Sequence, residues 1–210
     1  MLIISKHPLT ARDLTTLRDC HTRPDTFRRA LRRVSLQLVF ESTEHLELRR
    51  RQVETPLETT DGWTLAHQVI VVPVLRAGLG MVDAFLDLIP ETHVGHIGLY
   101  RDEATLQPVE YYAKFPEEVA SADVFILDPM LATGGSAVEA ANMLKRQGAV
   151  RIRLVTLVAA PEGVRSMEES HPDVVIHTAG LDRALNEKGY ILPGLGDAGD
   201  RIFGTGLAGV

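Results

Sequence analysis

Short apolar runs alternate with stretches of helical character from Val69 to Gly180, and this alternation constrains the fold more than any other feature of the sequence. The apolar runs are typical of buried strands: "VIVVPV", "VGHIGLY", "VFILD", "RIRLVTLVAAP" and "DVVIHTAG". Between them, "AGLGMVDAFLDLIP", residues 136–147 and "EGVRSMEESHP" have the character of helices. Strands that alternate with helices build βαβ units. We therefore predict an α/β fold with a mainly parallel, twisted sheet and helices on both faces.

An amphipathic helix is predicted ahead of this region, over residues 24–40. Four apolar side chains share one face at helical spacing: Phe27, Leu31, Val34 and Leu38. Four arginines, at 28, 29, 32 and 33, fall largely on the other side, as a solvated face or a subunit contact. The polar stretch that follows, "LELRRRQVETPLETTDGW", suggests a short hairpin that extends from the body.

The chain has 210 residues, a length that suits one domain over 1–210. We expect a core over about 66–180. The N-terminal helix and arm (about 1–65) and the C-terminal segment (about 181–210) are expected to form a small hood or interface.

Composition narrows the class of protein. The net charge of −6 argues against broad electrostatic capture of nucleic acid. Cys20 is the single cysteine, so no intramolecular disulfide can form, which fits a reducing cytosol. The start of the chain does not resemble a signal peptide, and no apolar run approaches a membrane span. We expect a soluble cytoplasmic protein that contacts neither membrane nor nucleic acid.

The stretch "VFILDPMLATGGSAVEA" carries the first chemical signal. Asp128 ends an apolar strand, and Thr133, Gly134, Gly135 and Ser136 lead into a helix. Glycines let the backbone approach a ligand, and amides at a helix N-terminus bind anions. A carboxylate beside such a site can accept hydrogen bonds from ribose hydroxyls. The stretch predicts a ribose 5-phosphate site, although TGGS alone also suits an ordinary turn with Ser136 as helix cap.

The stretch "VFILDPMLATGGS" resembles the phosphoribosyl-diphosphate (PRPP) motif of type I phosphoribosyltransferases. Those enzymes usually carry two adjacent acids, whereas here Pro129 follows Asp128. "DPMLATGGS" in this form resembles the uracil phosphoribosyltransferase branch. The resemblance implies PRPP contacts along the whole motif: Asp128, Pro129, Met130, Leu131, Ala132, Thr133, Gly134, Gly135 and Ser136.

Two further stretches extend the resemblance. "PVLRAGLGM" is similar to the diphosphate-binding loop of that family, with Arg76 as the cation. "YRDEATLQPVEYY" is similar to the mobile loop or hairpin that closes over the site, and Arg101 would supply a second cation. Taken alone, Arg101 would more often be a solvated charge.

The glycine-rich segment "GYILPGLGDAGDRIFGT" predicts an irregular loop, and its apolar residues favour docking against the body over disorder. It resembles the uracil-recognition segment of the same family. The resemblance implies uracil contacts at Ile191, Gly196, Asp197 and Ala198, with Asp197 also on the PRPP side. Backbone amides and carbonyls can match uracil and reject cytosine, whose amino group would face a donor.

The resemblance implies the conversion of uracil and PRPP to UMP and diphosphate in pyrimidine salvage. Arg76, Arg101 and Mg²⁺ bound through PRPP would stabilise the leaving group, and Asp197 is the candidate base. No protein-built metal cage is expected, and His67, His93 and His96 are interpreted as structural or exposed. The family further implies a homodimer or higher homo-oligomer and, in some bacterial members, GTP activation.

Two alternatives stay open. One is a regulatory protein that kept the PRPP fold and reads RNA, supported by the arginines at 28–33 and 49–51. The other is a phosphoribosyltransferase for another base, a purine or orotate. The segment "YILPGLGDAGD" argues against it. Orotate would also need a cation for its carboxylate, and Arg201 is the only arginine in the glycine-rich segment.

Overall fold

The computed structural model describes residues 1–101 and 108–205, and the side chains of Arg101 and Pro108 lie outside that description. Its main sheet runs, in spatial order, through β1 (Leu2–Ile4), β11 (Val175–Leu181), β10 (Arg151–Ala159), β8 (Asp123–Leu127), β4 (Val69–Leu75), β6 (His96–Arg101) and β7 (Pro108–Lys114). Two short strands join it: β5 (His93–Val94) beside β4, and β9 (Met130–Leu131) beside β10. The pairings are parallel except that of β6 with β7. The predicted α/β sheet is confirmed.

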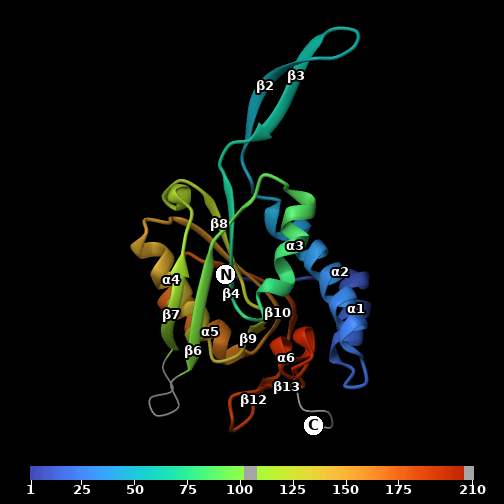
Figure 1. Cartoon of the computed structure of the whole chain (residues 1–210), viewed down its shortest axis with the longest axis vertical. Coiled ribbons are helices and arrows are strands. Elements are labelled where there is room, and N and C mark those ends of the chain that lie inside the picture. Colours follow the sequence, from blue (N-terminus) through green and yellow to red (C-terminus); the bar gives the residue numbers. More distant parts are fainter. Residues whose placement is uncertain (102–107, 206–210) are drawn as a thin grey trace.

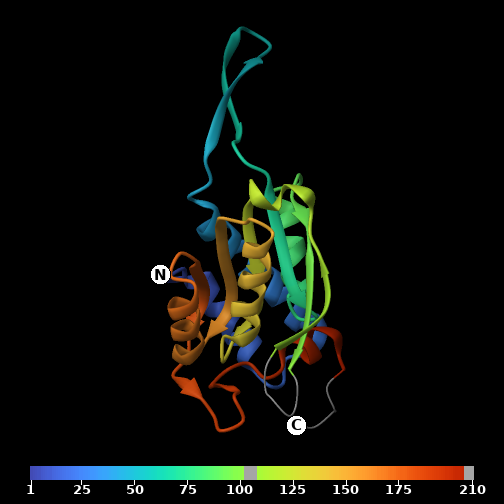
Figure 2. The same ribbon diagram turned by 90° about the vertical axis from the view of Figure 1, so that its left-hand side faces the viewer.

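Helices cover both faces of this sheet (Figures 1 and 2). One face packs against α1 (Pro8–Arg18), α2 (Pro24–Thr43) and α3 (Leu79–Leu88). The other packs against α4 (Gly135–Arg146) and α5 (Pro161–Ser170), and a short 3₁₀ helix, η1 (Glu117–Ala120), joins that side. The strands β4 and β8 are buried on both faces because each lies between two helical layers. Among the described residues, no helix combines the length and apolarity needed to cross a bilayer.

The predicted N-terminal helix is confirmed as α2, which continues three residues further than expected. Its predicted apolar stripe is buried throughout: Phe27, Leu31, Val34 and Leu38. The arginines on its other side do not simply face water. Arg29 pairs with Asp25, Arg32 with Asp87 and Arg33 with Asp13, while Arg28 donates to the carbonyl of Ile202. The elements β1 and α1 were not predicted from the sequence.

The predicted hairpin is formed by β2 (Leu48–Glu54) and β3 (Thr59–Leu65), which pair antiparallel. Both views show it projecting well beyond the body of the molecule (Figures 1 and 2). Most of its residues are exposed, including Leu57 at the tip and Trp63 on β3.

The glycine-rich C-terminal segment docks against the body, as its apolar residues predicted, but it is more ordered than a loop. It contains β13 (Ile191–Leu192), which pairs antiparallel with β12 (Ala184–Leu185) just before the segment, and the helix α6 (Ala198–Phe203). Ile191, Leu195 and Ile202 are buried in the same core as α2 and α3, whereas Phe203 is exposed.

Candidate active site

The candidate site lies where the strand order reverses. The chain passes from β4 through α3 to β6 on one side, and later through β8 to β10 on the other. In such sheets the crevice outside the carboxyl ends of the two central strands binds ligands. Arg76 follows β4 and Asp128 follows β8, so both predicted site residues stand at this crevice. Two cavities open here, and Asp128 and Ser136 line both.

The smaller cavity has a volume of about 50 Å³ and surrounds the start of α4. Its lining includes most of the predicted PRPP motif: Asp128, Met130, Leu131, Thr133, Gly134, Gly135, Ser136 and the neighbouring Ala137. Pro129 and Ala132 do not line it. Pro129 instead joins β10, because its carbonyl accepts from the amides of Leu157 and Val158.

The start of α4 forms one wall of this small cavity. The helix α4 begins at Gly135, so Ser136 lies in its first turn and is not the helix cap. The capping position is Gly134, at a φ of +88°, where a Cβ would come within 2.8 Å of Ser166. Glycine is therefore required there by both its backbone angle and its surroundings. Since a glycine supplies no capping side chain, the amides of the first turn can bind an anion.

Asp128 is half-buried at the junction of the two cavities. Its Oδ1 accepts from the amide of Met130 at 3.2 Å. Burial raises the pKa of this carboxyl to about 6, and the amide opposes that shift only in part. The carboxylate is thus poorly compensated without a ligand. Hydroxyl donors from a ribose would improve its surroundings.

The larger cavity, about 240 Å³, brings together four separate stretches of the sequence. Its lining is Val74, Leu75, Arg76, Ala77, Leu99, Asp128, Ser136, Asp197 and Gly199. Arg76 forms an ion pair with Asp200 of α6, with Nη2 and Oδ1 3.3 Å apart. The structure therefore joins the predicted diphosphate loop, the PRPP motif and the C-terminal segment around one space.

Of the predicted uracil contacts, Asp197 lines this cavity, while Ile191, Gly196 and Ala198 do not. Asp197 also caps α6, because its Oδ1 accepts from the amide of Asp200 at 2.8 Å. Gly199, in the same segment, lines the cavity and was not predicted. Its missing side chain leaves room between Asp197 and Arg76. The signal available in the sequence was its place in the glycine-rich segment, where a glycine lets a ligand approach the backbone closely.

Arg101 cannot be placed in the same way. Its backbone ends β6 opposite Pro108, as expected for one side of a hairpin. Its side chain and residues 102–107 lie outside the described part of the chain.

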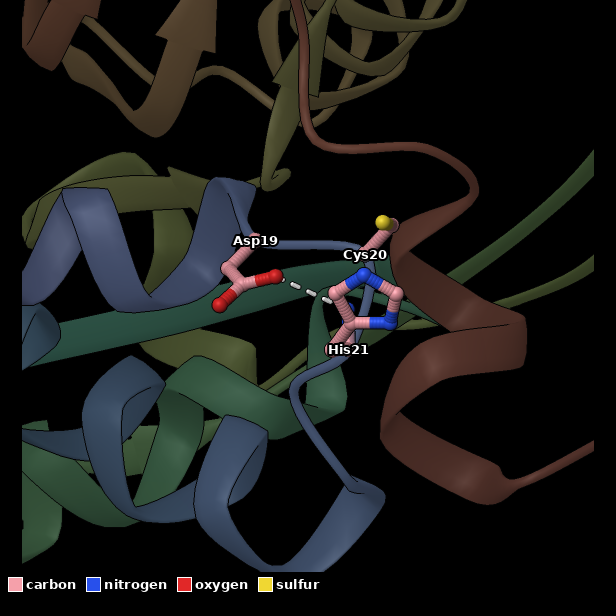
Figure 3. A group of neighbouring side chains, drawn as sticks. All are labelled: Asp19, Cys20 and His21. Atoms are coloured by element: carbon pink, nitrogen blue, oxygen red, sulfur yellow. Dashed lines mark hydrogen bonds between the residues drawn. The ribbon is translucent and has the colours of Figure 1, made fainter.

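A group of potential metal ligands lies apart from both cavities, in the turn between α1 and α2 (Figure 3). Ligand atoms of Asp19, Cys20 and His21 lie within 4.8 Å of one another, and all three residues are exposed. The Oδ1 of Asp19 accepts from the backbone amide of His21 at 2.9 Å. It is the one such group in the described residues, and it shares no residue with the cavities, so it is no candidate for the active-site metal.

A mainly parallel sheet with an acid after β8, a glycine turn before α4 and a cation after β4 is the arrangement of the type I phosphoribosyltransferase class. The model of the family "Uracil phosphoribosyltransferase" matches residues 4–205. The chain belongs to the uracil phosphoribosyltransferase family.

Relatives carry the same family name, and solved structures share the fold. Uracil phosphoribosyltransferase of Roseiflexus castenholzii is 56% identical over 98% of this chain and 99% of its own length. That of Thermosipho africanus is 54% identical over 95% and 96%. A solved protein from Aquifex aeolicus superposes with a TM-score of 0.94 at 35% identity, over 99% of this chain and 100% of that one. A Staphylococcus aureus hypoxanthine phosphoribosyltransferase, at 10% identity and a TM-score of 0.53 over 75% and 76%, shares the fold.

Proposed function

We propose that this chain transfers the phosphoribosyl group of PRPP to N1 of uracil, which gives UMP and diphosphate in pyrimidine salvage. The observation that carries the proposal is the larger cavity, where Arg76, Asp128, Ser136 and Asp197 meet from three sequence motifs. Family membership indicates the reaction. The meeting of a cation, two carboxylates and a hydroxyl in one cavity supports it, because these groups can bind the diphosphate and the ribose of PRPP.

In this proposal one molecule of PRPP occupies both cavities. The 5-phosphate occupies the smaller cavity, where the first-turn amides of α4 and the hydroxyls of Thr133 and Ser136 donate to it. The carboxylate of Asp128, at the junction, accepts from the ribose hydroxyls. The diphosphate extends into the larger cavity toward Arg76, whose guanidinium can contact two phosphate oxygens at once.

Positioning and stabilisation of the leaving group account for the chemistry in this proposal. As the bond from ribose C1 to the diphosphate lengthens, Arg76 and Arg101 stabilise the charge that develops on the phosphate oxygens. The site also suits Mg²⁺ brought in with PRPP, because the carboxylates of Asp128 and Asp197 line the same cavity and Mg²⁺ prefers oxygen ligands. When bound, Mg²⁺ supplies further neutralisation of the diphosphate.

The base is placed against the C-terminal segment, with contacts from Ile191, Gly196, Asp197 and Ala198. Fixed backbone donors and acceptors read the edge of uracil, and Asp197 is the candidate that accepts the N1 proton. The position of Asp197 in the cavity wall that also holds Arg76 supports this placement.

The wider setting is also proposed. We assign residues 66–180 to a catalytic core, with residues 1–65 and 181–210 as hood and interface, and we place the protein in the cytoplasm. A homodimer or higher homo-oligomer is favoured by the projecting hairpin of β2 and β3, since an isolated two-stranded hairpin is marginally stable. GTP activation rests on family resemblance alone.

One assay tests the reaction. The protein is incubated with PRPP, Mg²⁺ and, separately, uracil, cytosine, orotate and hypoxanthine, and nucleotide products are separated by chromatography. UMP from uracil alone is expected. A product from another base would change the substrate, and no product from any base, together with RNA binding in a gel shift, would favour a regulatory protein.

A further inference from the structure

We propose that Arg18 and Asp182 are positioning residues that fix the base-recognition loop, defined here as residues 191–198, and so determine its affinity and selectivity for the base. This inference rests on the proposed function. Neither residue lines the cavities, and they act through the backbone of Gly194.

The two side chains form a closed network with one residue of the loop. Arg18, at the end of α1, donates from Nη1 and Nη2 to the two carboxylate oxygens of Asp182, at 2.9 and 2.5 Å. The Oδ2 of Asp182 accepts from the amide of Gly194 at 2.8 Å. The Nη1 of Arg18 donates to the carbonyl of Gly194, also at 2.8 Å. Both backbone groups of Gly194 are therefore held.

Burial makes this network rigid. The side chain of Asp182 is 4% exposed and that of Arg18 is 26% exposed. Gly194 is buried at a φ of +63°, and a Cβ there would lie 2.3 Å from the carbonyl of Ile191. An ion pair with little access to water loses much if one partner is removed, because the other charge is left unpaired. The loop cannot shift at Gly194 without breaking these buried contacts.

Two further arginines donate to backbone carbonyls of the C-terminal segment and of the turn after α1. Arg201 donates to Leu195 at 2.8 Å and to Asp19 at 2.6 Å, and its guanidinium lies 4.5 Å from the ring centre of Phe27. Figure 3 shows the turn that carries Asp19 lying beside α6. Arg28 of α2 donates to Ile202 at 2.8 Å. The hydrogen bonds thus tie the C-terminal segment to α1, α2 and the turn between them.

This arrangement has a consequence for recognition. A site that reads a base through backbone groups discriminates only if those groups keep their places, because a mobile donor can turn away from a mismatched partner. The loop contains two glycines with positive φ, Gly194 and Gly196, and would be flexible alone. Arg18 and Asp182 remove that freedom next to the proposed uracil contacts at Gly196, Asp197 and Ala198.

The test uses conservative variants and compares the two substrates. Arg18→Lys keeps the charge but loses the planar fork, so it cannot serve both Asp182 and Gly194 in the same way. Asp182→Asn keeps an acceptor for the Gly194 amide but loses the ion pair. We expect each variant to raise KM for uracil about tenfold or more, because misplaced contacts are costly. KM for PRPP should change less than about twofold, and inhibition by cytosine should strengthen relative to uracil binding.

Arg146→Lys is the matched control, because Arg146 pairs with Glu139 on α4 and lines neither cavity. It should leave both KM values unchanged. Unchanged KM for uracil in both test variants, or an equal rise in both KM values with a lower Tm, would overturn the inference. UMP formation by the wild type is measured first, so its failure identifies an error in the proposed function instead.

Hydrogen exchange provides a measurement that needs no variant. The Gly194 amide donates to a buried carboxylate, so it should exchange as slowly as amides in the central strands. Fast exchange at Gly194 in the wild-type protein would contradict a rigid loop even if the variants failed to fold.

Discussion

Arg76, which lines the larger cavity, forms an ion pair with Asp200 of α6, with Nη2 and Oδ1 3.3 Å apart. The pair links the loop after β4 to α6, two segments 124 residues apart in the chain. Both side chains are partly exposed, at 57% and 38%. In the proposed reaction the guanidinium of Arg76 has to exchange the Asp200 carboxylate for the diphosphate of PRPP. Because the pair is partly exposed, it can orient Arg76 in the ligand-free protein and still be replaced by the diphosphate.

The roles of these two residues should separate in kinetics. Arg76→Ala removes a bidentate phosphate contact and should lower kcat/KM for PRPP about tenfold or more. Asp200→Asn removes only an exposed pair, and its effect on stability should stay within about 1 kcal/mol. Steady-state kinetics and thermal unfolding check both variants. Normal PRPP kinetics in Arg76→Ala would contradict its role at the diphosphate.

Replacement of Asp128 should stabilise the ligand-free protein and weaken its binding of PRPP. The folded-state pKa of about 6 exceeds the usual 3.8, so the folded protein favours the protonated carboxyl. Its ionisation therefore destabilises the ligand-free protein as pH rises from about 4 through 6. Asp128→Asn should be more stable than wild type by about 2 kcal/mol at pH 8, with no advantage at pH 3. Urea unfolding at both values measures this, and PRPP binding should be severely weakened.

The same carboxyl predicts a pH profile. If the ionised form accepts from the ribose hydroxyls, kcat/KM for PRPP should fall as pH drops below about 6, since this quantity reports the free enzyme. The decline should approach tenfold per pH unit. Because PRPP also titrates, the ionisation is confirmed by NMR of ¹³C-labelled aspartate. A resonance with a midpoint near 6 should be present in wild type and missing from Asp128→Asn; its absence from wild type would refute the assignment.

His177 should make the fold sensitive to acid. It is buried on β11, and its Nε2 lies 3.2 Å from Nη1 of Arg153. The Nε of Arg153 donates to Nε2 of His45 at 2.8 Å, and that same His45 nitrogen lies 3.9 Å from Oδ1 of Asp123. Burial, aided by Arg153, lowers the pKa of His177 to about 4. The unfolded chain takes up this proton near pH 6.5, so the group's stabilising contribution is present above 6.5 and is lost as pH falls toward 4.

The variant His177→Gln isolates this effect, because glutamine keeps an acceptor for Arg153 and cannot take up a proton. Between pH 7 and pH 4, wild type should lose about 3 kcal/mol more stability than the variant. Equal losses in urea unfolding experiments would show that His177 does not titrate in this way.

Asp197 allows a clean test of its proposed chemistry. Since its side chain caps α6, a loss of activity in Asp197→Ala would not distinguish the base from the cap. Asparagine caps helices as well as aspartate does. Asp197→Asn should therefore keep the Tm of wild type while turnover falls more than about tenfold. Turnover close to wild type would leave Asp197 with its cap and a backbone role in recognition only.

The alternation of apolar runs and helical stretches was enough to predict the sheet, its parallel character and the helices on both faces. These features follow from local periodicity and burial, which are visible in neighbouring residues. The strand-end positions of Arg76 and Asp128 were predictable for the same reason, because the carboxyl ends of parallel strands share one edge. The helix α1 was not predicted from the sequence, so the position of its last residue, Arg18, beside Asp182 could not be predicted either.

Sequence alone determined which chemical groups this protein brings to its candidate site: an acid after one strand, a cation after another, a glycine turn that begins a helix and a glycine-rich segment near the C-terminus. Only the tertiary structure decided which of them meet and what holds them. Asp182 also follows a strand, yet its contacts with Arg18, 164 residues earlier, and with Gly194 depend on how α1 packs against the C-terminal segment. Local patterns specify elements, whereas contacts between distant residues arise from the packing of those elements into one core.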